Sequence, residues 1–251
     1  MKKQHKTRCR QRGFTMLEVA LVVLTIGVVL GVSMAAKNQT ASKSTASEAA
    51  FMDSIVSATF LFVQRNYRLP CPDVTGNGFE TVTSPGVCAP SNTVGKVPYL
   101  TLGVPLSGPV GTGMDQKFTY GVYRGGGTDT KDLTLNAERS LPTPHVAPNA
   151  SYMNRDDFKQ AVINAWAAAA TVAATEIYVT GNDADTGASD CSGNEVANMA
   201  FIIAFQGSRD APVNDASTVT CFAGPGKPFS PTYDNLVKAV SFSELLGVLS
   251  R

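Results

Sequence analysis

The sequence predicts an α+β protein, and three features of the 251-residue chain support that prediction. A long helical pattern occupies the N-terminal part, short apolar segments separated by Gly, Pro, Asn and Ser fill the rest, and one amphipathic helix interrupts them. Helices and strands in separate blocks are typical of α+β folds. Hydrophobic residues make up 43% of the chain and charged residues 16%, which excludes a disordered, highly charged protein.

The net charge of +1 hides a strongly basic N-terminus. Six of the 21 Lys and Arg residues lie within the first 12 positions, and the first acidic residue is Glu18. Beyond residue 13 the chain keeps 15 basic and 20 acidic side chains, a net charge of −5. A nucleic-acid-binding arm is the less favoured interpretation because a hydrophobic segment follows the basic block. We therefore expect no nucleic acid partner.

Residues 14–36 predict a transmembrane helix. The segment has 17 apolar residues out of 23, and Glu18 is its one charge. About 20 apolar residues at a rise of 1.5 Å cross a bilayer core of about 30 Å. The preceding cations keep residues 1–12 in the cytoplasm by the positive-inside rule and send the rest outward. A plain signal anchor and a cleaved secretory signal peptide remain alternatives, the latter because Ser33-Met34-Ala35 is a small-residue site.

The junction reads Gly13-Phe14-Thr15-Met16-Leu17-Glu18. It resembles the processing site of type IV prepilins and of the pseudopilins of type II secretion systems. The resemblance implies that a prepilin peptidase cuts between Gly13 and Phe14 and N-methylates Phe14. Residues 1–13 are then a removable leader, and residues 14–36 are the retained transmembrane half of a long helix. The implied fold is pilin-like, with the amphipathic half of that helix packed on a β domain.

Glu18 needs a separate explanation. An ionised carboxylate within a membrane helix costs roughly 2.5–3.5 kcal/mol on insertion scales, and such residues are functional by default. The resemblance implies that Glu18 pairs with the new amino terminus of a neighbouring subunit; the alternative is a carboxylate at the headgroup level without a role. Gly27 and Gly31 form a small-residue pair that lets another helix approach closely, although Gly is common in membrane helices.

Residues 37–69 predict an amphipathic continuation of the helix, ended by Pro70, and residues 70–251 predict an exported globular domain. A second helix begins at Asp156, and its apolar face is predicted to contain Trp166. The expected strands span residues 117–123, 133–135, 197–205, 218–222 and 236–242, and a terminal helix spans 243–249. The apolar face of the second helix is Phe158, Val162, Ala165, Trp166 and Ala169.

The cysteines agree with export. Cys9 belongs to the leader, and four cysteines remain on the oxidising side of the membrane. Of three possible connectivities, we favour Cys71 with Cys88 and Cys191 with Cys221 because each pair brackets a loop-rich segment. Each closed loop is worth about 3–4 kcal/mol in the chain-entropy model. A zinc site is the alternative, but neither the cysteine spacing nor a nearby histidine favours it.

Two acidic loops resemble parts of a calcium loop. The first contains Asp73, Asn77 and Glu80, and the second contains Asp183 and Asp185. Pseudopilins of type II secretion use calcium in their β-domain loops, so the family resemblance makes these residues candidate ligands. Neither loop has the full 12-residue pattern, and Asx turns explain both loops without a cation. We therefore expect no metal and no other cofactor.

No enzymatic motif is expected either. His145 lies in a Pro-rich loop, and Gly125-Gly126-Gly127 lacks dinucleotide-binding spacing and predicts a hairpin turn. The stretch Arg68-Leu69-Pro70-Cys71-Pro72-Asp73 with Gly76-Asn77-Gly78 also resembles a recurring module of uncharacterised prepilin-like proteins in Gram-negative bacteria.

Together these patterns predict a non-enzymatic prepilin-like subunit, most consistent with a minor subunit of a type IV pilus or pseudopilus. The expected location is the inner membrane, crossed once, with the C-terminal domain in the periplasm. The expected partners are prepilin peptidase and other pilin or pseudopilin subunits, contacted through the N-terminal helix. Two alternatives remain: a filament-tip binding module, such as an adhesin or substrate-recognising subunit, and a Sec-secreted periplasmic protein.

Overall fold

The computed structural model describes residues 20, 23–24, 46–84, 87–89, 92–104, 117–128, 130–137, 139, 154–181, 191, 193–207, 220–230 and 233–250. The chain forms two units, Met1–Ala46 and Ser47–Arg251. In the first unit, Ala20, Val23 and Leu24 are helical and exposed. The predicted processing and assembly residues lie outside the described residues. The fold below is that of the second unit.

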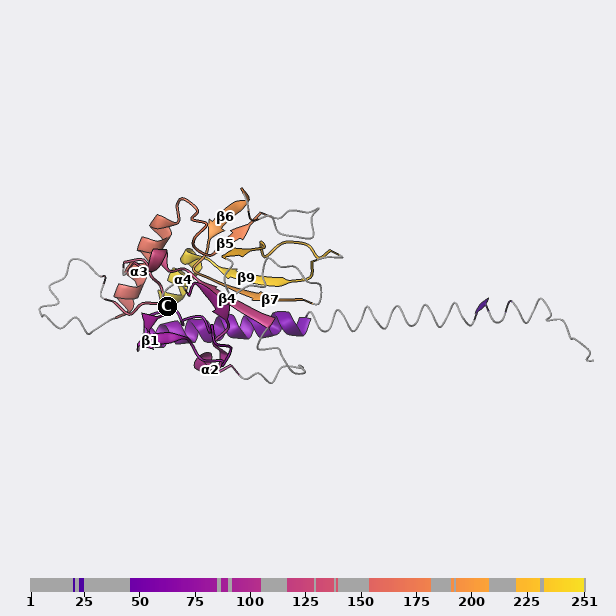
Figure 1. The fold of residues 1–251 in the computed structure, drawn as a ribbon, viewed down its shortest axis with the longest axis horizontal. Coiled ribbons are helices and arrows are strands. Elements are labelled where there is room, and N and C mark those ends of the chain that lie inside the picture. Colours follow the sequence, from indigo (N-terminus) through magenta and orange to yellow (C-terminus); the bar gives the residue numbers. More distant parts are fainter. Residues whose placement is uncertain are drawn as a thin grey trace, which may run out of the picture. The chain divides into compact units, whose positions relative to one another are not determined.

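The longest described helix is Ala46–Asn66 (Figure 1). It is also the one helix in the described part of the chain that is long and apolar enough to cross a membrane. One face, at spacings of three and four residues, is fully buried: Met52, Ile55, Thr59 and Val63. Because this face belongs to the core of the domain, the helix is the predicted amphipathic segment.

The helix ends before Pro70, as expected. Tyr67 has a left-handed backbone with φ of 51°, and its N–H donates to the carbonyl of Val63 at 2.8 Å. A left-handed residue that satisfies a carbonyl of the last turn is a common helix end. The chain therefore turns away from the helix axis at Tyr67.

Helix Ala46–Asn66 covers one face of a four-stranded antiparallel sheet. The strands are β3 (Val94–Lys96), β4 (Phe118–Val122), β7 (Phe201–Phe205) and β9 (Leu236–Val240), in that spatial order. Aromatic contacts fix the helix on the sheet. The ring centroids of Phe51 and Phe118 are 5.2 Å apart, and those of Phe60 and Phe201 are 5.9 Å apart. The helix thus runs in the same direction as β4.

A second sheet lies against the other face, in the order β6 (Glu195–Asn198), β5 (Tyr178–Thr180) and β8 (Cys221–Phe222). β5 pairs with β6 antiparallel and with β8 parallel. The contact between the sheets is close, since a Cβ atom at Gly121 would lie 2.8 Å from Ile177 and 3.2 Å from Phe222. Gly121 is therefore required for this layer packing.

The remaining elements are small. β1 (Val82–Ser84) and β2 (Val87–Cys88) form a hairpin, α2 (Tyr99–Leu102) is one turn, and η2 is Gly125–Gly127. Helix α3 (Arg155–Ala168) has a capping box in which Asn154 and Asp157 exchange side-chain and backbone hydrogen bonds. Helix α4 (Phe242–Leu249) closes the described chain. The α+β class is confirmed.

Several element predictions were wrong in detail. Segment 197–205 is two strands in two different sheets, because the chain leaves β6 at Asn198 and enters β7 at Phe201. Segment 133–135 forms no strand, because Asp132 organises a turn there by accepting from the backbone N–H and hydroxyl of Thr134. In segment 218–222 the described strand is Cys221–Phe222 alone. In segment 236–242 the strand ends at Val240 because Ser241 caps α4.

Two predictions about side chains and turns also need correction. Trp166 is 51% exposed, because Asp157, Phe158, Ala161, Val162 and Ala165 form a narrower buried face that leaves Trp166 at its edge. The three glycines after Arg124 form a 3-10 turn instead of a hairpin loop, and all three have positive φ.

Candidate functional site

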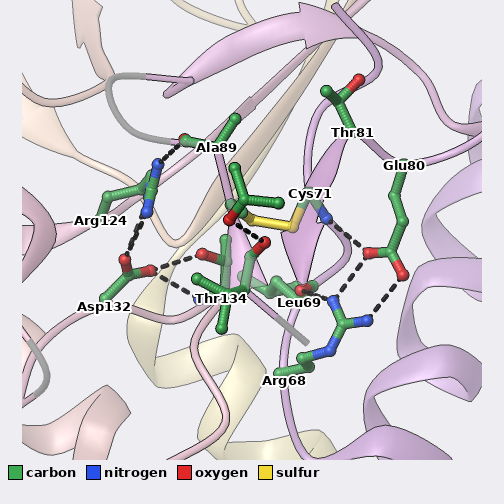
Figure 2. The surroundings of a disulfide bond; sticks show 12 residues. Arg68, Leu69, Cys71, Glu80, Thr81, Ala89, Arg124, Asp132 and Thr134 are labelled. Carbon is green, nitrogen blue, oxygen red and sulfur yellow. Dashed lines mark hydrogen bonds and ion pairs between the residues drawn. A yellow bond between two sulfur atoms is a disulfide. The ribbon is translucent and has the colours of Figure 1, made fainter. Parts of the chain in front are cut away.

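The most elaborate side-chain cluster lies around the disulfide between Cys71 and Cys88 (Figure 2). We call residues 67–104 the stapled segment, since they follow helix Ala46–Asn66, contain this bond and have only short elements, β1, β2, β3 and α2, between irregular stretches. An irregular segment with buried backbone groups needs hydrogen-bond partners outside helices and sheets. Charged side chains supply many of them.

Arg68 and Glu80 form the first ion pair of the cluster. The guanidinium donates through both terminal nitrogens to the two carboxylate oxygens, at 2.7 and 2.6 Å. The side chains are 8% and 16% exposed. Glu80 also accepts from the N–H of Cys71 at 3.0 Å, and Arg68 donates to the carbonyl of Leu69 at 3.1 Å. Figure 2 shows the carboxylate bridging the guanidinium and the backbone of Cys71. The pair therefore fixes the start of the stapled segment.

Arg124 and Asp132 form the second ion pair, at 2.9 Å. Arg124 also donates to the carbonyl of Ala89 at 2.7 Å, next to the disulfide. The other oxygen of Asp132 accepts from the N–H and the hydroxyl of Thr134. Glu176 accepts from the N–H of Arg124 and of Gly126, at 2.8 and 2.6 Å. This second pair thus ties the end of β4 to the stapled segment.

The first candidate calcium loop is held by internal hydrogen bonds. Asp73 is 1% exposed. One carboxylate oxygen accepts from the N–H and hydroxyl of Thr75 and from the N–H of Gly76, and the other accepts from the N–H of Gly78 at 2.6 Å. Asn77 accepts from the N–H of Phe79, and Glu80 is paired with Arg68. The loop is therefore an Asx-type turn whose oxygens serve the fold. Asp183 and Asp185 lie outside the described residues.

The four cysteines after the predicted leader pair as favoured from the sequence. Cys71 bonds Cys88 across a separation of 17 residues, and Cys191 bonds Cys221 across 30. The second bond links β8 to the chain before β6, and the hydroxyl of Tyr178 donates to the carbonyl of Cys191 at 3.0 Å. Each disulfide therefore closes a loop-rich segment onto a sheet.

Tyrosines near these clusters are kept protonated by their surroundings. Burial, with a further contribution from Glu80, raises the pKa of Tyr120 well above its usual value. Burial, assisted by Glu176, raises the pKa of Tyr123 to about 12. Burial and Glu195 raise the pKa of Tyr178. None of these phenols is poised to act as a base near neutral pH.

A groove of about 220 Å³ lies near the start of helix Ala46–Asn66, whereas the stapled segment follows the end of that helix. It is bounded by Ala49 and Met52 near the start of helix Ala46–Asn66, by the loop 224–229, and by residues 235–238 at and before the start of β9. Its volume is below the usual range of about 300–1,000 Å³ for small-molecule sites.

The cluster could be only partly predicted from the sequence. Asp73, Asn77 and Glu80 were weak candidate ligands, with Asx turns as the favoured explanation, and the structure uses their oxygens to hold the chain. The ion pairs of Arg68 and Arg124 were missed, although Arg68, between Tyr67 and Leu69 in a chain with little charge, was a signal. Gly13, Phe14, Glu18, Gly27, Gly31 and His145 lie outside the described residues. Within the described ranges no group of three or more His, Cys, Asp or Glu side chains could hold a metal ion.

The described chain is a disulfide-stabilised α+β domain with one apolar N-terminal helix, Ala46–Asn66. No protein-family model, curated protein or solved structure matches the chain. Function therefore has to be argued from its own residues.

Proposed function

We propose that the chain is a prepilin-like subunit, processed at Gly13 and assembled through its N-terminal helix into a type IV pilus or pseudopilus as a minor subunit. One observation carries the proposal: the order Gly13-Phe14-Thr15-Met16-Leu17-Glu18 after a basic leader and before an uncharged apolar run. Each part has a chemical reason. Glycine gives a peptidase close access to the backbone, the cations hold the leader in the cytoplasm, and the apolar run anchors the product.

The described domain is compatible with that role in two ways. Helix Ala46–Asn66 is docked by one face only, and Leu61 on its other side is 54% exposed. The exposed side also carries Asp53, Ser54 and Ser57, so it is mainly polar, with Leu61 as its large apolar residue. This uncovered side of the helix would face a neighbouring subunit. The two disulfides fit an oxidising compartment, as expected for a domain in the periplasm anchored in the inner membrane.

Assembly would rest on charge pairing in the apolar phase. Cleavage before Phe14 creates a positive amino terminus, and Glu18 provides a negative charge four residues later in the sequence. A carboxylate buried in hydrocarbon is strongly favoured to pair with a cation. Pairing between Glu18 of one subunit and the amino terminus of the next would set the axial register. The role of the protein is then structural, with no catalytic step and no cofactor.

Replacing Glu18 tests this proposal. Glu18→Ala should leave cleavage and membrane insertion intact but abolish incorporation into filaments, and Thr15→Ala is the matched neighbouring control. Incorporation is measured by blotting sheared filament fractions against membrane fractions. Normal incorporation of Glu18→Ala would refute the pairing role of the carboxylate.

A further inference from the structure

The groove beside β9 exposes the backbone edge of a strand. β9 is the last strand of its sheet, and among the described strands it pairs with β7 alone. The four consecutive residues 235–238 all line the groove. Side chains of successive strand residues point to opposite faces of a sheet. When consecutive residues all line one groove, that groove runs along the backbone edge of the strand. The groove therefore offers unpaired strand groups to an extended segment.

A buried donor lies in the same groove. Asn235 is 3% exposed and lines the groove. Its Oδ1 accepts from the N–H of Gly207 at 3.0 Å, which fixes the orientation of the amide. Its Nδ2 has no hydrogen-bond partner in the part of the chain that the structure describes. A buried amide donor without a partner is unfavourable. Because Nδ2 is closed to solvent, a carbonyl oxygen of an incoming strand would satisfy it by displacing the side chains that cover it.

The groove also has an apolar lining. Met52 forms part of it and is fully buried, whereas Phe229 on the loop wall is 52% exposed. A strand entering the groove would cover the Phe229 ring with a side chain of its own. The chemistry of the groove thus calls for an extended peptide with an apolar residue and free carbonyl groups.

The stapled segment provides such a strand at the other end of the domain. All three residues of β1 are exposed, and Val82 is an exposed apolar side chain at 40%. Within the described residues β1 pairs only with β2. Arg68 and Glu80 hold β1 just beyond the end of helix Ala46–Asn66. Ala49, which lines the groove, lies near the start of the same helix. The 17 steps from Ala49 to Asn66 at the helix end span about 25 Å at 1.5 Å each.

We infer that β1 of one copy pairs with the edge of β9 in a second copy, with Val82 against Phe229 and a β1 carbonyl on Asn235 Nδ2. The two surfaces differ and lie near opposite ends of the helix, so the contact is head-to-tail, and with a rotation that does not close it repeats as a filament. Such a contact would fix the spacing of copies along a filament. The inference deepens the proposed function and rests on it.

Cross-linking of the full-length chain in its membrane tests the contact. One tagged copy carries Thr83→Cys and a second, differently tagged copy carries Phe229→Cys, both with Cys9→Ser. A short bis-maleimide joins thiols that lie within several ångströms of each other. The expected product is the mixed dimer, and a single chain with both substitutions should give a ladder of multimers. The matched control pairs Phe229→Cys with Val196→Cys, at a position 58% exposed on β6, and should give no product.

Asn235→Asp is the specific variant. It keeps the oxygen that accepts from Gly207 and replaces the donor by a second acceptor. We expect about a tenfold lower yield of the mixed dimer, the equivalent of one buried hydrogen bond. Labelling of Phe229→Cys by a monofunctional maleimide should be unchanged, which shows that the domain remains folded. An unchanged cross-linking yield would overturn the role of Asn235.

Three other results would overturn the β1–β9 contact. The first is dominant dimers between two Thr83→Cys copies or two Phe229→Cys copies, which indicate a two-fold contact. The second is absence of the mixed dimer in cells where Glu18-dependent filaments form, which leaves the proposed function intact. The third is failure of Phe229→Cys to label in the unassembled chain, since the groove is then filled from within. A mature chain that does not begin at Phe14 would instead overturn the proposed function.

Discussion

Removing Glu80, whose ion pair with Arg68 measures 2.6 Å, should destabilise the domain far more than removing Asp53, an exposed carboxylate paired with Lys238 at 2.7 Å. Glu80→Ala deletes three hydrogen bonds, two from Arg68 and one from the N–H of Cys71. The guanidinium, 8% exposed, then stays in the interior without its counter-charge. Breaking a buried ion pair on one side costs about 3–5 kcal/mol. We expect a loss of that size in the free energy of unfolding.

Asp53→Ala is the control for Glu80→Ala. Asp53 contacts Lys238 at 2.7 Å, but the two side chains are 63% and 45% exposed. Solvent screening limits such a pair to about 0.2–1 kcal/mol. Both variants are compared by urea unfolding of the full chain in mild detergent, followed by circular dichroism. Equal losses for the two variants, or a loss below about 1 kcal/mol for Glu80→Ala, would refute the argument that burial makes the Arg68 pair structurally important.

Three further predictions concern two glycines and the pH dependence of stability. Gly95→Ala should destabilise the domain by about 1–3 kcal/mol, because its Cβ would lie 2.7 Å from the backbone oxygen of Asp73; Gly247→Ala, in a helix with no other described atom within 4 Å of the new Cβ, should instead stabilise it by about 0.5–1 kcal/mol. Thermal unfolding checks both signs, and a destabilising Gly247→Ala would contradict the packing argument. Alkaline pH should weaken the fold, because the pKa of Tyr123 is about 12 in the folded state and about 10 in the unfolded chain. The unfolded chain therefore loses its proton first, and stability falls as the pH rises from about 10 to 12. The urea midpoint should decline over that range, and less steeply in Tyr123→Phe; identical slopes would argue against a buried phenol.

The spacing of apolar residues predicted the elements whose pattern is contained within one continuous stretch of sequence. The face of helix Ala46–Asn66 and the end before Pro70 followed from spacing and from proline chemistry. The strand pattern of 197–205 was visible as one apolar run, but its division between two sheets was not. That division depends on β4, β9 and β5, which are distant in sequence, so no local pattern could reveal it.

The side-chain cluster shows a second limit of sequence reasoning. Asp73 and Glu80 have the residue types of cation ligands, and the sequence does not show that backbone N–H groups and Arg68 occupy their oxygens. Segment 133–135 was misassigned for a related reason, since a buried carboxylate at Asp132 overrides the strand preference of two leucines. Disulfide pairing was easier to predict because each pair encloses a short loop-rich stretch.

The proposed processing determines the first residue of the mature protein, so mass spectrometry of the chain isolated from membranes tests the proposed function. We expect an N-terminal peptide that begins at Phe14 and carries one methyl group on its amine, with residues 1–13 absent. A mature chain that begins at Ala36 would indicate a cleaved secretory signal peptide and refute processing at Gly13. A chain that retains the bond between Gly13 and Phe14 would refute it as well.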